Sequence, residues 1–139
     1  MRRLGAQDAM EDAGLTFDDR LYGLSNYDFE SAYHAMNGLL ARRAEFTALF
    51  AMSDVIAFGA IRALVSAGLR VPEDVSVIGF DGITMSRYCV PVMTTIVQPS
   101  EQIALQSIEL LVRQIEHGTP AQTVTLQPEL QQGESVRAL

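Results

Sequence analysis

The sequence has no lysine, no tryptophan and only one cysteine, Cys89. Without lysine, the chain has neither a Schiff-base lysine nor the lysine of a phosphate-binding P-loop. A single cysteine cannot form an intramolecular disulfide, so a reducing cytoplasm is the expected location. No apolar run approaches the roughly 20 residues of a membrane-spanning helix, and no signal-peptide pattern is present, so we expect no membrane partner.

The composition indicates a folded acidic domain. The 139 residues are 48% hydrophobic and 19% charged, with a net charge of −7. This length suits one domain that buries roughly two thirds of its unfolded surface, and the apolar content is too high for intrinsic disorder. Because an acidic surface repels phosphate backbones, we do not expect this chain by itself to bind nucleic acid.

Helix and strand signals alternate along the chain. A helix is expected at 2–13, closed by Gly14; because it opens the chain with no strand before it, the domain is expected to be part of something longer. The other expected helices span 27–42, with Phe29, Tyr33, Met36 and Leu40 on its apolar side, 54–67 and 100–117, with Ile103, Ser107, Leu111 and Ile115 on one side. Strands are expected at 20–24, at 48–52 with both faces buried, at 75–80, at 94–97 and, as an edge strand, at 123–127.

This alternation predicts an α/β fold, a three-layer sandwich around a mostly parallel sheet. In such sheets ligands bind beyond the carboxyl ends of the strands. The ends available are residues 52–54 and 80–82, which makes Asp54 and Asp81 candidate ligand contacts.

Motifs for catalysis are missing. The sequence contains no glycine-rich phosphate loop, no dinucleotide fingerprint and no nucleophile elbow. His34 is expected mid-helix and His117 at a helix end, where a cation favours the dipole, and neither has metal-ligand spacing to Cys89. We therefore predict a protein that is not an enzyme and has no cofactor or metal site.

Two segments carry a family resemblance. Residues 47–82 read TALFAMSDVIAFGAIRALVSAGLRVPEDVSVIGFDG, and residues 91–99 read PVMTTIVQP. Together they closely resemble the effector-binding core of LacI/GalR-type bacterial transcriptional repressors. Fainter similarities at the start (Arg2, Gly5 and 13–15) and in the tail (125–130 and 133–135) extend the resemblance over essentially the whole chain.

The resemblance implies a periplasmic-binding-protein-like (type I) fold, in which two α/β lobes hold a small molecule, often a sugar, between them. Residues 1–139 would form the C-terminal effector-binding and dimerisation lobe as a single unit. The helix-turn-helix and most of the N-terminal lobe would be absent, so operator DNA would be contacted only by the missing part. The alternative is the sugar-binding component of an ABC transporter with the same fold.

Five residues are the expected ligand contacts. Asp81 would accept hydrogen bonds from vicinal hydroxyls, and the resemblance makes Arg2 the ligand-binding arginine and Tyr27 the aromatic that stacks on a sugar ring. Ser53 and Asp54 would face the same cleft. The alternatives are a solvated turn aspartate for Asp81, an exposed charge for Arg2, a core aromatic for Tyr27 and helix capping for Asp54.

Three positions depart from the family pattern. Ser53 stands where relatives usually have asparagine, Gly82 replaces the second aspartate of a pair, and Ser100 replaces an aromatic found in some sugar-binding relatives. A homodimer is also expected, because helix 55–65 is apolar on every side and the loop 85–92 adds apolar surface.

Overall fold

A four-stranded sheet organises the chain in the computed structural model, which describes residues 2–43 and 45–138. The strands lie in chain order, and the first three are parallel whereas the last runs antiparallel to its neighbour. The α/β class with a mostly parallel sheet is thereby confirmed. The strands are β1 (Ala48–Phe50), β2 (Ser76–Asp81), β3 (Thr94–Val97) and β4 (Glu129–Gln131).

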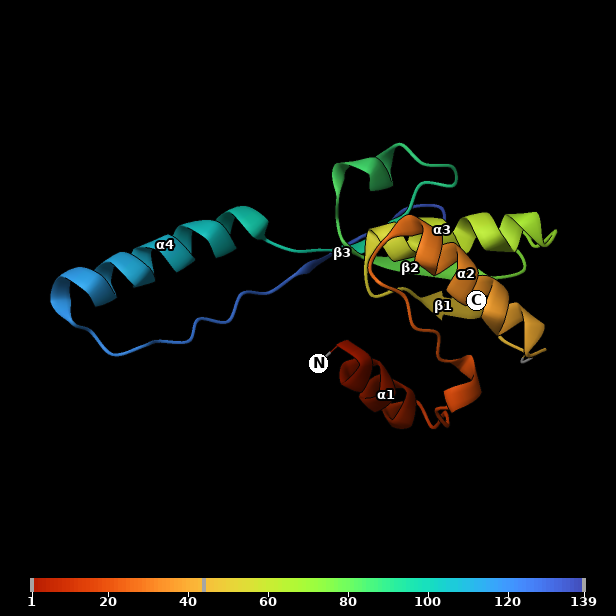
Figure 1. Ribbon diagram of the computed structural model, residues 1–139, viewed down its shortest axis with the longest axis horizontal. Coiled ribbons are helices and arrows are strands. Elements are labelled where there is room, and N and C mark those ends of the chain that lie inside the picture. The colour runs from red at the N-terminus through yellow and green to blue at the C-terminus, as the bar shows by residue number, and fades with distance from the viewer. Residues whose placement is uncertain (1, 44, 139) are drawn as a thin grey trace.

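Helices α2 (Phe29–Ala41) and α3 (Asp54–Ser66) pack together against one side of the sheet (Figure 1). Their axes come close because Gly59 has no side chain: a Cβ there would lie 2.4 Å from the carbonyl oxygen of Phe29. Most of the hydrophobic core lies between these helices and the sheet. Its most deeply buried apolar members are Ala57, Ala63, Leu64, Val77 and Met93.

Two predictions about β1 and α2 need correction. The strand expected at 48–52 is shorter and not buried on both faces, because β1 pairs only with β2 among the described residues and leaves Phe50 exposed at the sheet edge. Helix α2 buries Ala32, Met36 and Leu39, whereas Phe29, expected on the apolar side, is half exposed.

Helix α1 (Arg2–Asp12) lies apart from the α2–α3 layer, near β1, and a short 3-10 helix, η1 (Asp19–Leu21), follows it (Figure 1). The strand expected at 20–24 is therefore wrong. The Asp18 carboxylate accepts a hydrogen bond from the Arg20 backbone nitrogen at 2.8 Å and pairs with the Arg20 guanidinium, which stabilises a turn instead of an extended segment.

Helix α4 (Ser100–His117) extends away from the sheet (Figure 1). We call residues 98–128 the α4 arm. The helix was predicted correctly, but none of its residues is buried. The edge strand expected at 123–127 does not form; the chain is irregular there and becomes a strand only at β4, where β3 supplies a partner. Among the described residues, no helix is long and apolar enough to cross a membrane.

Candidate functional site

Polar side chains converge at the edge of the sheet where β1, β2 and β3 end. Asp81 is the last residue of β2, and its backbone has φ +116°, a conformation that is uncommon for any residue except glycine. Such backbone strain is concentrated in proteins at functional sites. The carboxylate is thus held at a fixed place beyond the end of the strand.

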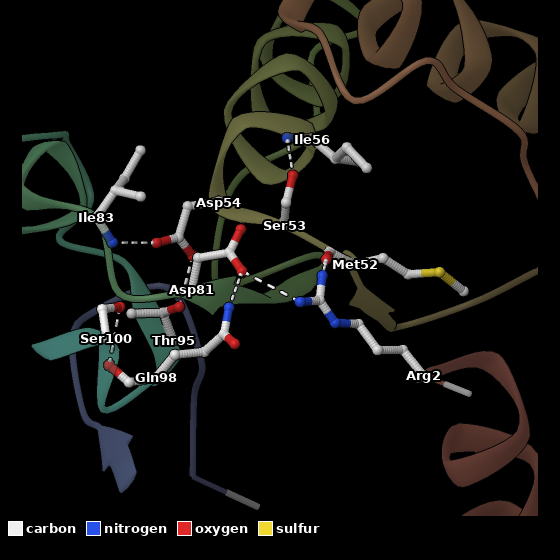
Figure 2. Close-up of polar contacts among 10 residues, drawn as sticks. All are labelled: Arg2, Met52, Ser53, Asp54, Ile56, Asp81, Ile83, Thr95, Gln98 and Ser100. Atoms are coloured by element: carbon white, nitrogen blue, oxygen red, sulfur yellow. Dashed lines mark hydrogen bonds and ion pairs between the residues drawn. The ribbon is translucent and has the colours of Figure 1, made fainter. Parts of the chain in front are cut away.

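Two donors from distant parts of the chain meet the Asp81 carboxylate (Figure 2). Arg2 Nη2 lies 3.3 Å from Asp81 Oδ1, and Gln98 Nε2 donates to the same oxygen at 2.6 Å. The side chains of Arg2 and Asp81 are 32% and 29% exposed, so a molecule from solvent can reach both. Within the described residues Oδ2 accepts no hydrogen bond, which leaves it available to a ligand.

Arg2 is held by more than its ion pair. Its guanidinium carbon lies 4.0 Å from the centre of the Phe80 ring, a cation–π contact, and Nη1 donates to the Met52 carbonyl at the end of β1. A guanidinium has five N–H donors in a fixed plane, so donors remain for a ligand after these bonds are made. The arrangement brings together Arg2 and Asp81, two of the residues that the sequence analysis selected as ligand contacts.

Ser53 and Asp54 are present at this edge, but their side chains turn inward (Figure 2). Ser53 is the N-cap of α3 and accepts from the Ile56 backbone nitrogen at 3.2 Å. The alternative of helix capping for Asp54 is therefore wrong, because Ser53 is the cap. Asp54 is fully buried, accepts from the Ile83 backbone nitrogen at 2.8 Å, and takes a second hydrogen bond from the Thr95 hydroxyl. Both side chains therefore bind other parts of the chain and stabilise the backbone around the site.

Tyr27 lies away from the Asp81 cluster. It is 57% exposed and lines a cavity of about 170 Å³ that Met52 also lines. Met52 therefore links the two features: it lines the cavity beside Tyr27, and its carbonyl accepts a hydrogen bond from Arg2. The structure does not bring Tyr27 into contact with Asp81, but leaves its ring available to a ligand that extends past Met52.

Gln98 is the site residue that the sequence reasoning missed. It directly follows β3, so the rule that ligands bind at the carboxyl ends of parallel strands would have selected it. Under that rule the predicted ligand contacts came only from the ends at 52–54 and 80–82, and Gln98 stood only within the segment 91–99 that carries the family resemblance. Its side-chain amide makes a shorter hydrogen bond to the Asp81 carboxylate than Arg2 does.

The departures at Gly82 and Ser100 change the shape of the site. Gly82 has φ +71°, and a Cβ there would lie 2.7 Å from Val97 Cγ2, so the fold does not accommodate a second aspartate without movement. Ser100 begins α4, and its hydroxyl makes only a 3.4 Å contact with the Gln98 carbonyl. One carboxylate, one guanidinium and one amide are therefore the polar side-chain groups that meet beyond the end of β2.

The other residues considered for chemistry, two histidines and one cysteine, have structural roles. His34 is exposed and makes an edge contact with the Tyr33 ring at 5.6 Å, while His117 is the last residue of α4. Burial raises the pKa of the Cys89 thiol, and its sulfur contacts the carbonyls of Ser86 and Pro91. Within residues 2–43 and 45–138, no group of three or more histidines, cysteines or carboxylates could hold a metal ion.

Comparison with known proteins supports a binding role. Residues 1–136 match the family model described as periplasmic binding protein-like domain. The HTH-type transcriptional regulator MalR of Clostridium butyricum is 39% identical over 131 residues, which are 94% of this chain and 39% of that protein. The HTH-type transcriptional repressor PurR of Histophilus somni is 38% identical over 140 residues, or 100% of this chain and 42% of that protein. The chain therefore spans about two fifths of the length of these relatives.

Solved structures give the same result. A structure of the transcriptional regulator CelR in complex with cellobiose superposes with a TM-score of 0.92 at 35% identity, over 96% of this chain and 41% of that chain. A sugar-binding transcriptional regulator of the LacI family from Escherichia coli, complexed with phosphate, has a TM-score of 0.88 at 32% identity, over 97% of this chain and 49% of that chain. These relatives are transcriptional regulators, not enzymes.

Proposed function

Because the chain belongs to the periplasmic binding protein-like family, and matches there the effector-binding domains of LacI-type regulators, we propose that it senses a small polar effector for a transcriptional repressor. The observation that carries this proposal is the convergence of Arg2, Asp81 and Gln98 at the ends of the parallel strands. Free donors on Arg2 and the free Oδ2 of Asp81 together match a hydroxyl pair, which both donates and accepts hydrogen bonds.

The effector that we propose is a sugar. A neutral polyhydroxyl ligand suits one carboxylate and one guanidinium that already balance each other in charge. Tyr27 would add a stacking surface at the far end of the ligand, beside the 170 Å³ cavity. The cellobiose complex of CelR, a structure with TM-score 0.92 to this chain, supports this class.

Residues 1–139 would form the C-terminal lobe of a two-lobe sensor. The α4 arm supports this proposal, because Ile108, Leu111 and Ile115 on α4 are more than half exposed. An apolar helix face of this kind normally packs against another layer. In relatives more than twice as long, chain outside the matched region is available to cover it. Operator DNA would be bound by that further chain, since the acidic segment described above repels phosphates.

Effector binding would act by closing the two lobes on the ligand. A ligand shifts the equilibrium between open and closed lobes only by as much as it binds the closed form better than the open one. Asp81 and Arg2 on this lobe would supply part of that preference, and the other lobe would supply the rest.

A chimera tests the proposal. In CelR, the segment matched by this chain would be replaced with residues 1–139, and operator binding would be followed by fluorescence anisotropy during a cellobiose titration. We expect release from DNA, and for Asp81→Ala a rise of roughly tenfold to hundredfold in the concentration needed, because a hydrogen bond to a charged group is lost. Asp8→Ala, at an exposed aspartate on α1, is the matched control. Unchanged release by the Asp81→Ala chimera would show that the site is wrongly assigned.

We further propose that the sensor is a homodimer. Met85, Tyr88 and Val90 form an exposed apolar surface, with Val90 93% exposed, which is unusual for a monomer. A second copy would cover this 85–90 surface together with part of α3. The double variant Tyr88→Asp/Val90→Asp should sediment as a monomer, whereas Leu24→Asp, at a leucine that is 78% exposed elsewhere, should sediment like the unmodified chain. Equal sedimentation of both variants would exclude this surface as the interface.

A further inference from the structure

Asp54 is a fully buried carboxylate beside the site, and both of its oxygens bind groups inside the protein. We propose that Asp54 is a positioning residue that holds the turn after β2 in the backbone conformation that presents the Asp81 carboxylate to a ligand. The inference rests on the proposed function in taking Asp81 as a ligand contact. The hold on the turn is a property of the chain itself and can be measured without a ligand.

The turn after β2 has an unusual backbone. Asp81 and Gly82 both have positive φ, +116° and +71°. For an aspartate this conformation is sterically unfavourable, and such strain persists only where the surrounding structure holds it. Because φ is a rotation about the bond from N to Cα, relaxation of Asp81 to negative φ would swing its carboxylate away from Arg2 and Gln98. The position of the carboxylate therefore depends on what fixes the turn.

The start of the turn is fixed by β3. Asp81 pairs with Val97 in the sheet, and its carbonyl accepts a hydrogen bond from the Gln98 backbone nitrogen at 3.3 Å. A Cβ at Gly82 would lie 2.7 Å from Val97 Cγ2, so the turn passes directly against this side chain. These contacts set where the turn begins, but not the direction in which the chain leaves it.

The end of the turn is fixed by Asp54 (Figure 2). Its Oδ2 accepts from the backbone nitrogen of Ile83 at 2.8 Å, and Ile83 directly follows the two residues with positive φ. Ile83 has φ −66° and ψ 152°, so the chain returns to an ordinary extended conformation at the residue that Asp54 binds. The Asp54 carboxylate thus sets where the turn ends, and Asp81 lies between two fixed points.

The Asp54 carboxylate is itself held by three elements. Asp54 is the first residue of α3, where the positive end of the helix dipole favours a carboxylate. Its Oδ1 accepts from the hydroxyl of Thr95 on β3. Gly79 on β2 provides the space, because a Cβ there would overlap Oδ1. The carboxylate therefore joins α3, β2 and β3 to the turn that carries Asp81.

Two substitutions at Asp54 separate hydrogen bonding from charge. Asp54→Ala removes both acceptors and leaves the Ile83 N–H without this partner. Asp54→Asn removes the charge but can keep both contacts: its carbonyl accepts from Ile83, and its amide donates to the Thr95 hydroxyl, which can accept as well as donate. Leu64→Val, at a fully buried residue near the opposite end of α3, is the matched control for a loss of core packing.

The turn is measured in residues 1–139 without ligand by NMR. The three-bond coupling between the amide proton and Hα of Asp81 reports its φ. Hydrogen exchange gives the ratio of the exchange rate at Ile83 to that at Val77, a fully buried β2 residue whose amide reports opening of the core. Because a core opening raises both rates, only a local loosening of the turn raises their ratio.

We expect Asp54→Ala to raise the exchange ratio by roughly tenfold, because a hydrogen bond to a charged group is lost, and to shift the Asp81 coupling toward negative φ. Asp54→Asn and Leu64→Val should keep both values of the unmodified chain. An unchanged ratio and coupling in Asp54→Ala, or the same changes in Leu64→Val, would overturn the proposal.

In the CelR chimera, the same variants test whether Asp54 acts through Asp81. Asp54→Ala should raise the cellobiose concentration for half-release roughly tenfold, whereas Asp54→Asn should leave it unchanged. The double variant Asp54→Ala/Asp81→Ala should need no more cellobiose than Asp81→Ala alone, because the two changes remove the same contact with the ligand. Additive effects, or an Asp54→Asn effect as large as that of Asp54→Ala, would contradict a positioning role.

Thr95→Val keeps the proposal testable if Asp54→Ala does not fold. It removes the donor to Oδ1 without touching the turn, and it should raise the exchange ratio at Ile83, whereas Thr95→Ser keeps the hydroxyl and should not. Equal ratios in these two variants would also overturn the proposal. If the turn responds as expected while the Asp81→Ala chimera releases DNA normally, the hold of Asp54 on the turn stands and the proposed ligand site is wrong.

Discussion

Helices α3 and α4 are both rich in apolar residues, yet α3 buries six of its 13 residues and α4 buries none of its 18. Helix α3 is apolar on all sides and packs against both α2 and β2. Helix α4 has apolar and charged residues on different sides, the pattern of a helix with one face to bury, and it extends into solvent (Figure 1). The two helices differ in what surrounds them more than in their capacity to form a helix.

The comparison shows what an amphipathic pattern can establish. The pattern says that a helix has a face to cover, but it does not say whether the covering layer lies in the same stretch of chain. The body, which comprises the sheet with α2 and α3, contains its own covering layers. The α4 arm does not, and its exposed face agrees with the proposal that further chain completes the sensor.

A pair of leucine truncations should give the largest difference between the two regions. Leu64 on α3 is fully buried, and Leu64→Ala should lower the free energy of unfolding by about 2–5 kcal/mol, because it leaves a cavity in a packed core. Leu111 on α4 is 56% exposed, and Leu111→Ala should change it by no more than about 0.5 kcal/mol. Urea unfolding followed by circular dichroism measures both. Comparable losses in the two variants would mean that α4 is packed in solution as α3 is.

The sequence predicted the strands inside the sheet better than the segments outside it. The strand expected at 94–97 forms at those residues, because its β-branched residues lie between two other strands. The strand expected at 123–127 alternates equally well but has no neighbour in the described chain to complete its hydrogen bonds. The strand expected at 20–24 does not form because the Asp18 carboxylate stabilises a turn there. A pattern of apolar residues does not reveal such a turn. Strand formation depends on partners, which a local pattern does not contain.

The candidate site was predicted in part. Arg2 and Asp81 were each expected to contact a ligand, and their side chains lie 3.3 Å apart. Ser53 and Asp54 are both good N-cap residues, so the sequence could not decide which would cap α3; the extended backbone of Ser53 makes it the cap and carries Asp54 into the interior. Gln98 was missed because its partner lies 17 residues earlier in the chain, a contact that only the sheet register creates.

The smallest expected difference concerns one ion pair in each region, both between residues four apart. In the body, the Asp74 carboxylate accepts from the Arg70 guanidinium at 2.8 and 2.9 Å and from the Arg70 backbone nitrogen at 2.8 Å. In the arm, Glu109 accepts one bond, from Arg113. The bonds from Arg70 lower the pKa of Asp74 from 3.8 to about 2. A group whose pKa is lowered by folding stabilises the fold above its unfolded pKa, so this contribution is present at pH 5 and is lost as the pH falls from about 4 toward 2.

Asp74→Asn should therefore narrow the difference in unfolding free energy between pH 5 and pH 2.5, whereas Glu109→Gln should leave that difference as it is in the unmodified chain. The effect should be small and should weaken in high salt, because the Arg70–Asp74 pair lies at the surface. Urea titrations at the two pH values, with and without added salt, measure it. If Glu109→Gln narrowed the difference as much as Asp74→Asn, the arm would contribute to the same cooperative unfolding as the body. The two regions would then have to be treated as one folding unit, which their packing does not indicate.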